Sequence, residues 1–245
     1  MRILLPISLS LLLVTGAALA QGSLLDQGKR LMEGGGAGGA KSSGGSLSQG
    51  QIGDGLREAL KVGTDRTVGR VGRADGFLAD QAIRIKPPGL VQKAAPALKL
   101  AGYGNLVDDL ELKMNRAAEK AAPLAKDIFA DAISKMTIDD ARQILDGPQD
   151  AATQYLRKTS SDPLYKAMRP IIDDQLTDVG AVKALDNLVQ RGSGLPGTGS
   201  LGFDLGDHVT DKALDGLFLY IAKEEEAIRR NPAARTTDLL KTVFK

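Results

Sequence analysis

Apolar residues at helical spacing run through the middle of the chain and restrict its possible folds more than any other feature. They recur every three or four positions with charged residues between them: Val107, Leu110, Met114, Ala117, Ala121, Leu124 and Ile128. This period predicts an amphipathic helix that buries one stripe in a coiled-coil-like seam. Several seam residues are alanines, so a partner helix can approach closely.

Pro123 lies inside this pattern and lacks the backbone N–H that a helix interior needs. We therefore expect a kinked helical arm, with the kink near Glu119, rather than a straight rod. The apolar pattern continues through Phe129, Ala132 and Met136, so the arm extends to about residue 136.

Helical spacing also predicts a first helix over residues 52–71. A short helix begins at Thr137, where Thr137 and Asp140 have the spacing of a capping box, and it ends at Gly147. Another helix covers residues 148–158.

Three further signals mark helix starts toward the carboxyl end. Asp162 before Pro163 predicts the start of a separate, longer helix, which Pro170 kinks or divides. Asp207 is expected to cap a helix after a glycine-rich loop, and a last helix starts at Thr236.

The remaining composition favours helices over sheets. Aromatic residues make up 4% of the chain, and it has no Trp and no Cys. Residues 82–88 alternate apolar and basic residues before two prolines and predict one short extended segment. The sequence therefore predicts an all-α fold: a single compact multi-helix bundle with a kinked long helical arm and at most one short extended segment near 82–88.

The amino-terminal residues have the pattern of a cleavable signal peptide. Arg2 precedes an apolar run over residues 3–14, and the segment ends in Ala18-Leu19-Ala20, so we expect cleavage after Ala20 and a periplasmic location. The apolar run is too short for a membrane span. Gln21 follows the cleavage point where a bacterial lipid anchor requires cysteine, so we expect no lipid anchor.

Glycine and serine dominate the next segment. Residues 21–50 are expected to form a flexible linker, and residues 51–245 the helical domain. The formal net charge is +2 and no strongly basic cluster stands out, so we do not expect a nucleic-acid partner.

The single histidine limits the catalytic possibilities. His208 lies between Asp207 and Asp211, and an imidazole with carboxylates suits a divalent metal. Carboxylates in the first turn of a helix also have a structural explanation, because the helix dipole favours them there. We favour the structural interpretation, expect no bound metal or cofactor, and assign no catalytic residue.

Other carboxylates and arginines are open to two interpretations. The run from Glu224 to Glu226 is interpreted as a solvated helix face. Asn115, Arg116 and Glu119 fall within one helical turn, so the Arg116 and Glu119 side chains can pair. They either bind a ligand or partner or form internal contacts.

A second polar group lies near the carboxyl end. Arg235 with Thr236 at a helix start can receive a carboxylate or phosphate, or can attach the last helix to the bundle.

Five segments in order share a pattern with a known family: GLREAL (55–60), DQAIRI (80–85), MNRAAE (114–119), VTDKALDGLF (209–218) and NPAARTTDLL (231–240). Together they resemble the bacterial exported family called domain of unknown function 4197, over roughly residues 55–244. The resemblance implies an α-helical domain of the Gram-negative cell envelope behind a signal peptide. It implies no established activity and no catalytic residue.

These observations favour a non-enzymatic binding or interaction module. Its partner is expected to be a small apolar ligand or a cell-envelope protein, received in an alanine-lined interior or groove between helices. Two alternatives stay open: a metal- or carboxylate-dependent hydrolase centred on His208, and a purely structural envelope protein.

Overall fold

The structure is a computed structural model that describes residues 48–178, 204–231 and 241. Within these residues the chain forms helices and no strand, which confirms the all-α prediction. The predicted signal peptide lies outside the described residues, as do residues 21–47 of the predicted linker, Arg235 and Thr236. Residues 49 and 50, predicted as the end of the linker, belong to helix α2. No helix among the described residues combines the length and apolar character needed to cross a membrane.

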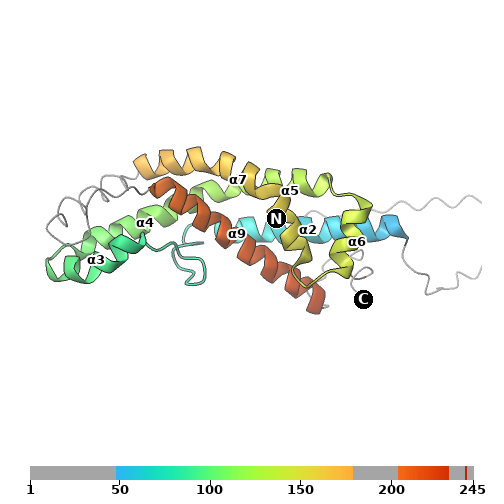
Figure 1. Cartoon of the computed structure of the whole chain (residues 1–245), viewed down its shortest axis with the longest axis horizontal. Helices are drawn as coiled ribbons and strands as arrows, with labels where there is room; N and C mark the ends of the chain where they lie inside the picture. The colour runs from blue at the N-terminus through green and yellow to red at the C-terminus, as the bar shows by residue number, and fades with distance from the viewer. Residues whose placement is uncertain (1–47, 179–203, 232–240, 242–245) are drawn as a thin grey trace, which may run out of the picture. The chain divides into compact units, whose positions relative to one another are not determined.

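Long helices that pack side by side make up the bundle (Figure 1). Helix α7 packs against α9, α4 and α5, and α2 packs against α9, α5 and α6. Figure 1 shows α3 and α6 toward opposite ends of this helical unit. The helices are α2 (Gln49–Val71), α3 (Gly89–Leu100), α4 (Gly104–Ala121), the 3-10 turn η1 (Ala122–Leu124), α5 (Ala125–Ser134), α6 (Ile138–Asp146), α7 (Ala151–Asp178) and α9 (Leu205–Arg230).

The predicted seam is buried along α4 but not at Leu124. Its first five members, from Val107 to Ala121, are buried as expected. Leu124 is exposed, and beyond it the buried positions are those of Ala125, Phe129, Ala132 and Ile133. Ala118 and Ala122 are also buried, so a stripe through Ala118, Ala122, Ala125 and Phe129 continues across η1 and leaves Leu124 outside it. In α5 that face brings the Phe129 ring against Phe218 of α9, with ring centroids 5.9 Å apart.

The break in the arm lies at Pro123 rather than near Glu119. Helix α4 stays regular to Ala121, and Pro123 occupies the first positions of η1. A proline there sacrifices no helical hydrogen bond, because the N–H groups of a first turn have no intrahelical partner. The predicted kink is therefore a short 3-10 turn between two helices.

The short helix α6 has the predicted ends. The Thr137 hydroxyl accepts a hydrogen bond from the Asp140 N–H at 3.1 Å, and the Asp140 carboxylate accepts one from the Thr137 N–H at 2.9 Å. Gly147 follows the last helical residue. The capping box and the glycine stop are both confirmed.

The predicted break before Pro163 was wrong, because α7 is continuous through both Pro163 and Pro170. Both prolines are exposed, and so are Thr159 and Lys166, whose carbonyls lose the bonds that the prolines cannot donate. On the opposite side a buried stripe repeats every four residues: Leu156, Ser160, Leu164, Met168, Ile172 and Leu176. Burial of this stripe outweighs a penalty of about 3 kcal/mol for each helical proline.

The segment between α2 and α3 crosses the bundle without forming a strand. Turns occupy most of residues 72–83, and residues 84–88 have no regular secondary structure. Phe77, Ile83 and Ile85 of this segment are buried in the core. The segment packs closely against α9, because Gly216 of that helix lies against the Phe77 ring.

Glycines inside α2 and α9 provide a stability test. A Cβ at Gly63 would meet Glu224 Cβ at an ordinary 3.5 Å, and one at Gly69 would meet nothing within 4 Å, whereas one at Gly216 would lie 2.7 Å from Phe77 Cε1. We expect Gly63→Ala and Gly69→Ala each to raise the free energy of unfolding by about 0.5–1 kcal/mol. Gly216→Ala should lower it by about 1–3 kcal/mol through overpacking. Urea denaturation of the three variants measures this, and a stabilised Gly216→Ala variant would contradict the packing described here.

Candidate functional site

The predicted group on α4 holds the segment between α2 and α3 in place. The Asn115 side chain is fully buried, and its Oδ1 accepts a hydrogen bond from the Ile85 N–H at 2.9 Å. Its Nδ2 donates to the carbonyls of Ile85, at 2.8 Å, and Glu111, at 2.7 Å. The amide therefore pairs with Ile85 much as a neighbouring strand would, and these bonds make Asn115 an internal contact.

Glu119 is buried one turn further along α4. Its Oε1 accepts hydrogen bonds from the backbone N–H groups of Phe77, at 3.0 Å, and Leu78, at 3.1 Å. Its Oε2 accepts from Arg116 at 2.6 Å, so the predicted Arg116–Glu119 pair is formed. Arg116 also binds Asp75 at 2.7 Å, and the hydrogen bonds to Glu119 and then Asp75 raise the pKa of the guanidinium. Each of these side chains is engaged within the fold.

Helix α9 begins three residues earlier than predicted. Asp204, not Asp207, is the N-cap, because its Oδ1 accepts a hydrogen bond from the Asp207 N–H at 3.0 Å. Asp207 lies in the first turn, where the helix dipole favours a carboxylate. That bond and then Arg169 hold the pKa of Asp204 below its usual range, despite partial desolvation.

Arg169 of α7 collects the carboxylates around this helix start. Its Nε lies 2.8 Å from Asp173 Oδ2, its Nη2 lies 2.8 Å from Asp204 Oδ2, and its Nη1 binds Asp207. The Tyr165 hydroxyl also donates to Asp207, which raises the pKa of the tyrosine. The hydrogen bonds of Arg169 with Asp173 and then with Asp204 raise the pKa of the Arg169 guanidinium. Asp207 therefore belongs to an ion-pair cluster between α7 and α9.

His208 is half-buried and turns toward the segment before α3. Its Nε2 lies 2.9 Å from the Lys86 carbonyl oxygen. Asp211 is exposed one turn later and shares with His208 the lining of a surface groove, which Asp207 does not line. Among the residues that the structure describes, no group of three His, Asp or Glu residues is placed to hold a metal ion. The described residues thus do not assemble the metal site that one form of the hydrolase hypothesis requires.

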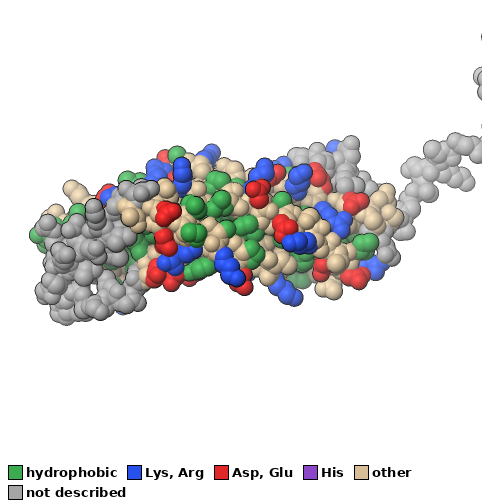
Figure 2. All heavy atoms as spheres, turned by 90° about the horizontal axis from the view of Figure 1, so that it is seen from above, with side chains coloured by type: hydrophobic (Ala, Val, Ile, Leu, Met, Phe, Trp, Pro, Cys, Tyr) green, Lys and Arg blue, Asp and Glu red, His purple; other side chains and the backbone are tan. Residues whose placement is uncertain are grey.

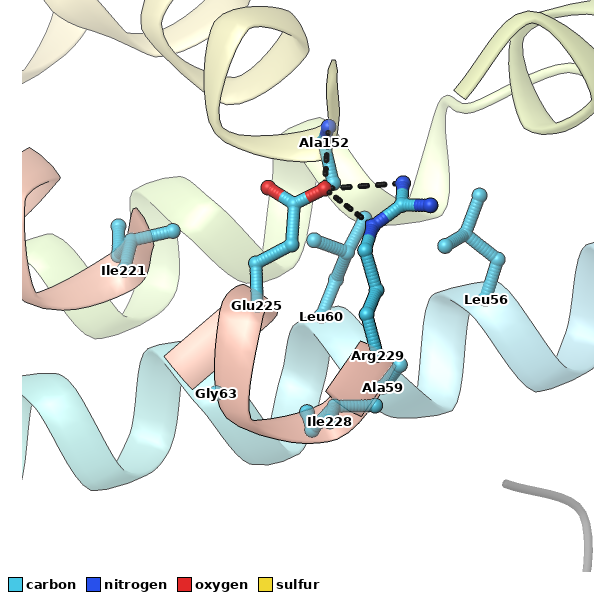
Figure 3. Close-up of a pocket in the computed structure, with 9 residues that line it drawn as sticks. All are labelled: Leu56, Ala59, Leu60, Gly63, Ala152, Ile221, Glu225, Ile228 and Arg229. Carbon is cyan, nitrogen blue, oxygen red and sulfur yellow. Dashed lines mark hydrogen bonds and ion pairs between the residues drawn. The ribbon is translucent and has the colours of Figure 1, made fainter. Parts of the chain in front are cut away.

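The cavity inside the bundle is too small for a ligand. It measures about 20 Å³ and lies between α2, α7 and α9. One water needs about 10–15 Å³ on this measure, whereas ligand pockets measure about 300–1,000 Å³. Figure 3 shows its lining, which is apolar apart from two side chains: Leu56, Ala59, Leu60, Gly63, Ala152, Ile221, Glu225, Ile228 and Arg229.

The two polar side chains of this cavity, Glu225 and Arg229, join three helices. Glu225 of α9 accepts a hydrogen bond from the N–H group of Ala152 at 3.0 Å, in the first turn of α7 (Figure 3). It accepts a second one from the N–H group of the next residue, Thr153, at 2.8 Å. Arg229 binds Glu225 at 3.0 Å and donates to the Ile144 carbonyl of α6 at 2.8 Å. The Glu225 carboxylate thus caps the start of α7, which is remote in sequence. Arg229 in turn donates a hydrogen bond to a carbonyl in the last turn of α6.

Two adjoining hollows lie between α7 and α9 and are far larger than the interior cavity. They measure about 490 and 550 Å³ and share Arg157, Lys212, Asp215 and Phe218, so we name them together the α7–α9 groove. The Arg157 guanidinium carbon lies 4.4 Å from the centre of the Phe218 ring, and Nη1 lies 3.9 Å from Asp215. Lys212 binds Asp215 at 3.1 Å. The groove therefore presents a half-exposed arginine stacked on a buried aromatic ring.

Sequence interpretation missed the residues that matter most at these contacts. Glu225 was placed on a solvated face, although it follows Ile221 by four residues and precedes Ile228 by three, which is the spacing of the buried stripe. Arg157 carried no local signal, because Asp215 and Phe218 are far away in sequence. Arg169 has a local partner in Asp173, at i, i+4 spacing, but its contacts with Asp204 and Asp207 are equally remote in sequence.

Glu225 and its neighbour Glu226 provide a matched test of the buried pair. The Glu225 and Arg229 side chains are 7% and 14% exposed, whereas those of Glu226 and Arg230, at the same spacing on α9, are 51% and 60% exposed. We expect Glu225→Ala to lower the free energy of unfolding by about 3–5 kcal/mol, because it leaves a buried arginine and two N–H groups without their acceptor. Glu226→Ala should change it by less than about 1 kcal/mol. Similar losses for both variants in chemical denaturation would rule out a special role for Glu225.

Asp204 gives the start of α9 a pH dependence. Its pKa is lower in the folded than in the unfolded state, so its ionised form stabilises the fold above the unfolded value, near 3.8, and this contribution is lost as the pH falls through the folded value. Asn can also cap a helix, so Asp204→Asn mainly removes the charge. We expect the stability difference between wild type and Asp204→Asn to be constant from about pH 5 to 7 and to shrink below about pH 4. Denaturation across this range measures it, and a difference that persists at pH 3 would refute the assignment.

Comparison with known proteins adds one finding to this geometry. A family model described as Protein of unknown function (DUF4197) matches residues 46–245. Neither the curated proteins nor the solved structures give a significant match. The match covers every helix described above and confirms the resemblance carried by the five sequence segments. The chain therefore belongs to the DUF4197 family.

Proposed function

We propose that this protein is an exported, periplasmic binding module without a catalytic role, and that it receives a polypeptide segment of an envelope partner in the α7–α9 groove. The observation that carries the proposal is Arg157, which is stacked on Phe218 where the two hollows meet. Stacking fixes the guanidinium before a partner arrives, which lowers the entropy cost of binding. Arginine beside an aromatic ring is also a frequent centre of binding energy at protein interfaces.

The lining of the groove favours a polypeptide over a small apolar ligand. Asp162, Asp211 and Asp215 supply negative charge, and Arg157 and Lys212 supply positive charge. Figure 2, seen from the α7 side, likewise shows acidic and basic side chains interspersed with hydrophobic ones. A partner segment with both signs of charge and a carboxylate for Arg157 would match this surface.

The size of the cavities supports the same choice. The interior cavity has room for about one water, so an apolar ligand would have to displace packed side chains of α2 and α9. The groove is large enough and open to solvent along the helices. Export rests on the signal-peptide pattern of residues 1–20.

Site-specific photo-crosslinking in the periplasm tests the proposal. A photoreactive residue at Leu219, which lines the groove, should give a discrete crosslinked product with one protein. Ile138 on α6 is the matched control, because it is similarly exposed (42% against 38%) and does not line the groove. We expect Arg157→Glu to reduce the Leu219 product at least tenfold without lowering the melting temperature. Identical products from Leu219 and Ile138, or a product unaffected by Arg157→Glu, would contradict the proposal.

A further inference from the structure

Helix α3 has apolar residues on both of its faces. Val91 and Leu98 face the core and are buried, with Ala94 and Ala95 packed beside them. The outer face carries Leu100, which is 92% exposed, and Leu90, which is 45% exposed. An apolar face of a helix is normally buried against another element, yet among the described elements α3 packs mainly on α4, and Leu90 and Leu100 stay exposed.

Polar residues on α3 are few and, where charged, only basic. Gln92, Lys93 and Lys99 are its polar residues, and all three are exposed. The chain from residue 81 to residue 107 contains four basic residues and no acidic one. The outer face of α3 therefore combines apolar and positive side chains.

Carboxylates of α4 neutralise only part of this charge. Arg84 binds Glu111 at 2.6 Å, and Lys99 lies 3.9 Å from Asp108, with both side chains of that second pair more than half exposed. Lys86 and Lys93 form no ion pair with any residue that the structure describes. Positive charge consequently remains available beside Leu90 and Leu100.

We propose that the outer face of α3 binds the surface of an anionic phospholipid bilayer. Leu90 and Leu100 would enter the boundary between headgroups and acyl chains, while Lys93 and Lys99 contact lipid phosphates. An exposed helix with basic residues, apolar residues and no carboxylate has the chemistry of such interfacial helices. A protein partner is the weaker choice, because protein surfaces present both signs of charge and α3 offers only one. This surface is separate from the α7–α9 groove, so the inference goes beyond the function proposed above.

Vesicle flotation of the mature chain tests the inference. The wild type should float with vesicles that contain phosphatidylglycerol and stay unbound with vesicles of phosphatidylcholine alone. We expect Leu100→Asp, and separately the double variant Lys93→Glu with Lys99→Glu, to reduce the bound fraction at least tenfold. Leu100 is almost fully exposed, so its replacement should leave the fold intact, which circular dichroism checks.

Two controls separate this surface from the others. Ile138→Asp introduces the same charge at an exposed apolar position on α6, and Arg157→Glu alters the α7–α9 groove; both should bind vesicles as the wild type does. Equal binding to both vesicle types, or no effect of Leu100→Asp, would overturn the inference. It would also be overturned if analytical ultracentrifugation without lipid showed a dimer that Leu100→Asp dissociates, because α3 would then be an interface between two copies.

Discussion

The bundle depends on a buried carboxylate that caps a helix from outside. Glu225 of α9 accepts the first-turn N–H groups of α7, and Arg229 of the same helix neutralises it while binding the last turn of α6. A helix start carries unsatisfied donors and partial positive charge, so placing it in a core without an acceptor would be costly. The Glu225–Arg229 pair removes this cost for α7. It also attaches the start of α7 and the end of α6 to the same part of α9.

The other side of the bundle uses the same solution. Glu119 accepts the N–H groups of Phe77 and Leu78, and Asn115 pairs with the backbone of Ile85, so α4 supplies the acceptors that an irregular crossing segment needs. Buried backbone groups outside regular structure must find such partners. The hydrogen bonds of Asn115 and Glu119 therefore have a structural explanation. The bonds to Ile85 also position the next residue, Lys86, shortly before α3. The Lys86 carbonyl oxygen contacts the His208 ring.

Much of this fold could be predicted from the chain alone, and the errors have common causes. The stripe along α4, the capping box at Thr137 and the Arg116–Glu119 pair were predictable because each depends on residues within one or two turns. The exposure of Leu124 and the continuity of α7 through Pro163 were not, because tertiary packing decides which helix face is buried and whether a proline ends a helix. Arg169 of α7 binds both Asp204 and Asp207, so only the hydrogen bond from the Asp207 N–H to the Asp204 carboxylate identifies Asp204, rather than the predicted Asp207, as the cap. Glu225 was recoverable from the helical period, whereas its acceptor role required knowledge of where α7 begins.

The same packing directs function to the surface. The alanines along α4 are buried against neighbouring helices and do not line the interior cavity, which lies between α2, α7 and α9 and has room for about one water. The α7–α9 groove is polar and mixed in charge, whereas the outer face of α3 is apolar and basic. These two chemistries suit different partners, since a mixed groove discriminates among polypeptides whereas a basic and apolar helix responds to any anionic interface. A module that holds a protein segment on one face and a bilayer surface on another could position that segment at the membrane, with no catalytic group required.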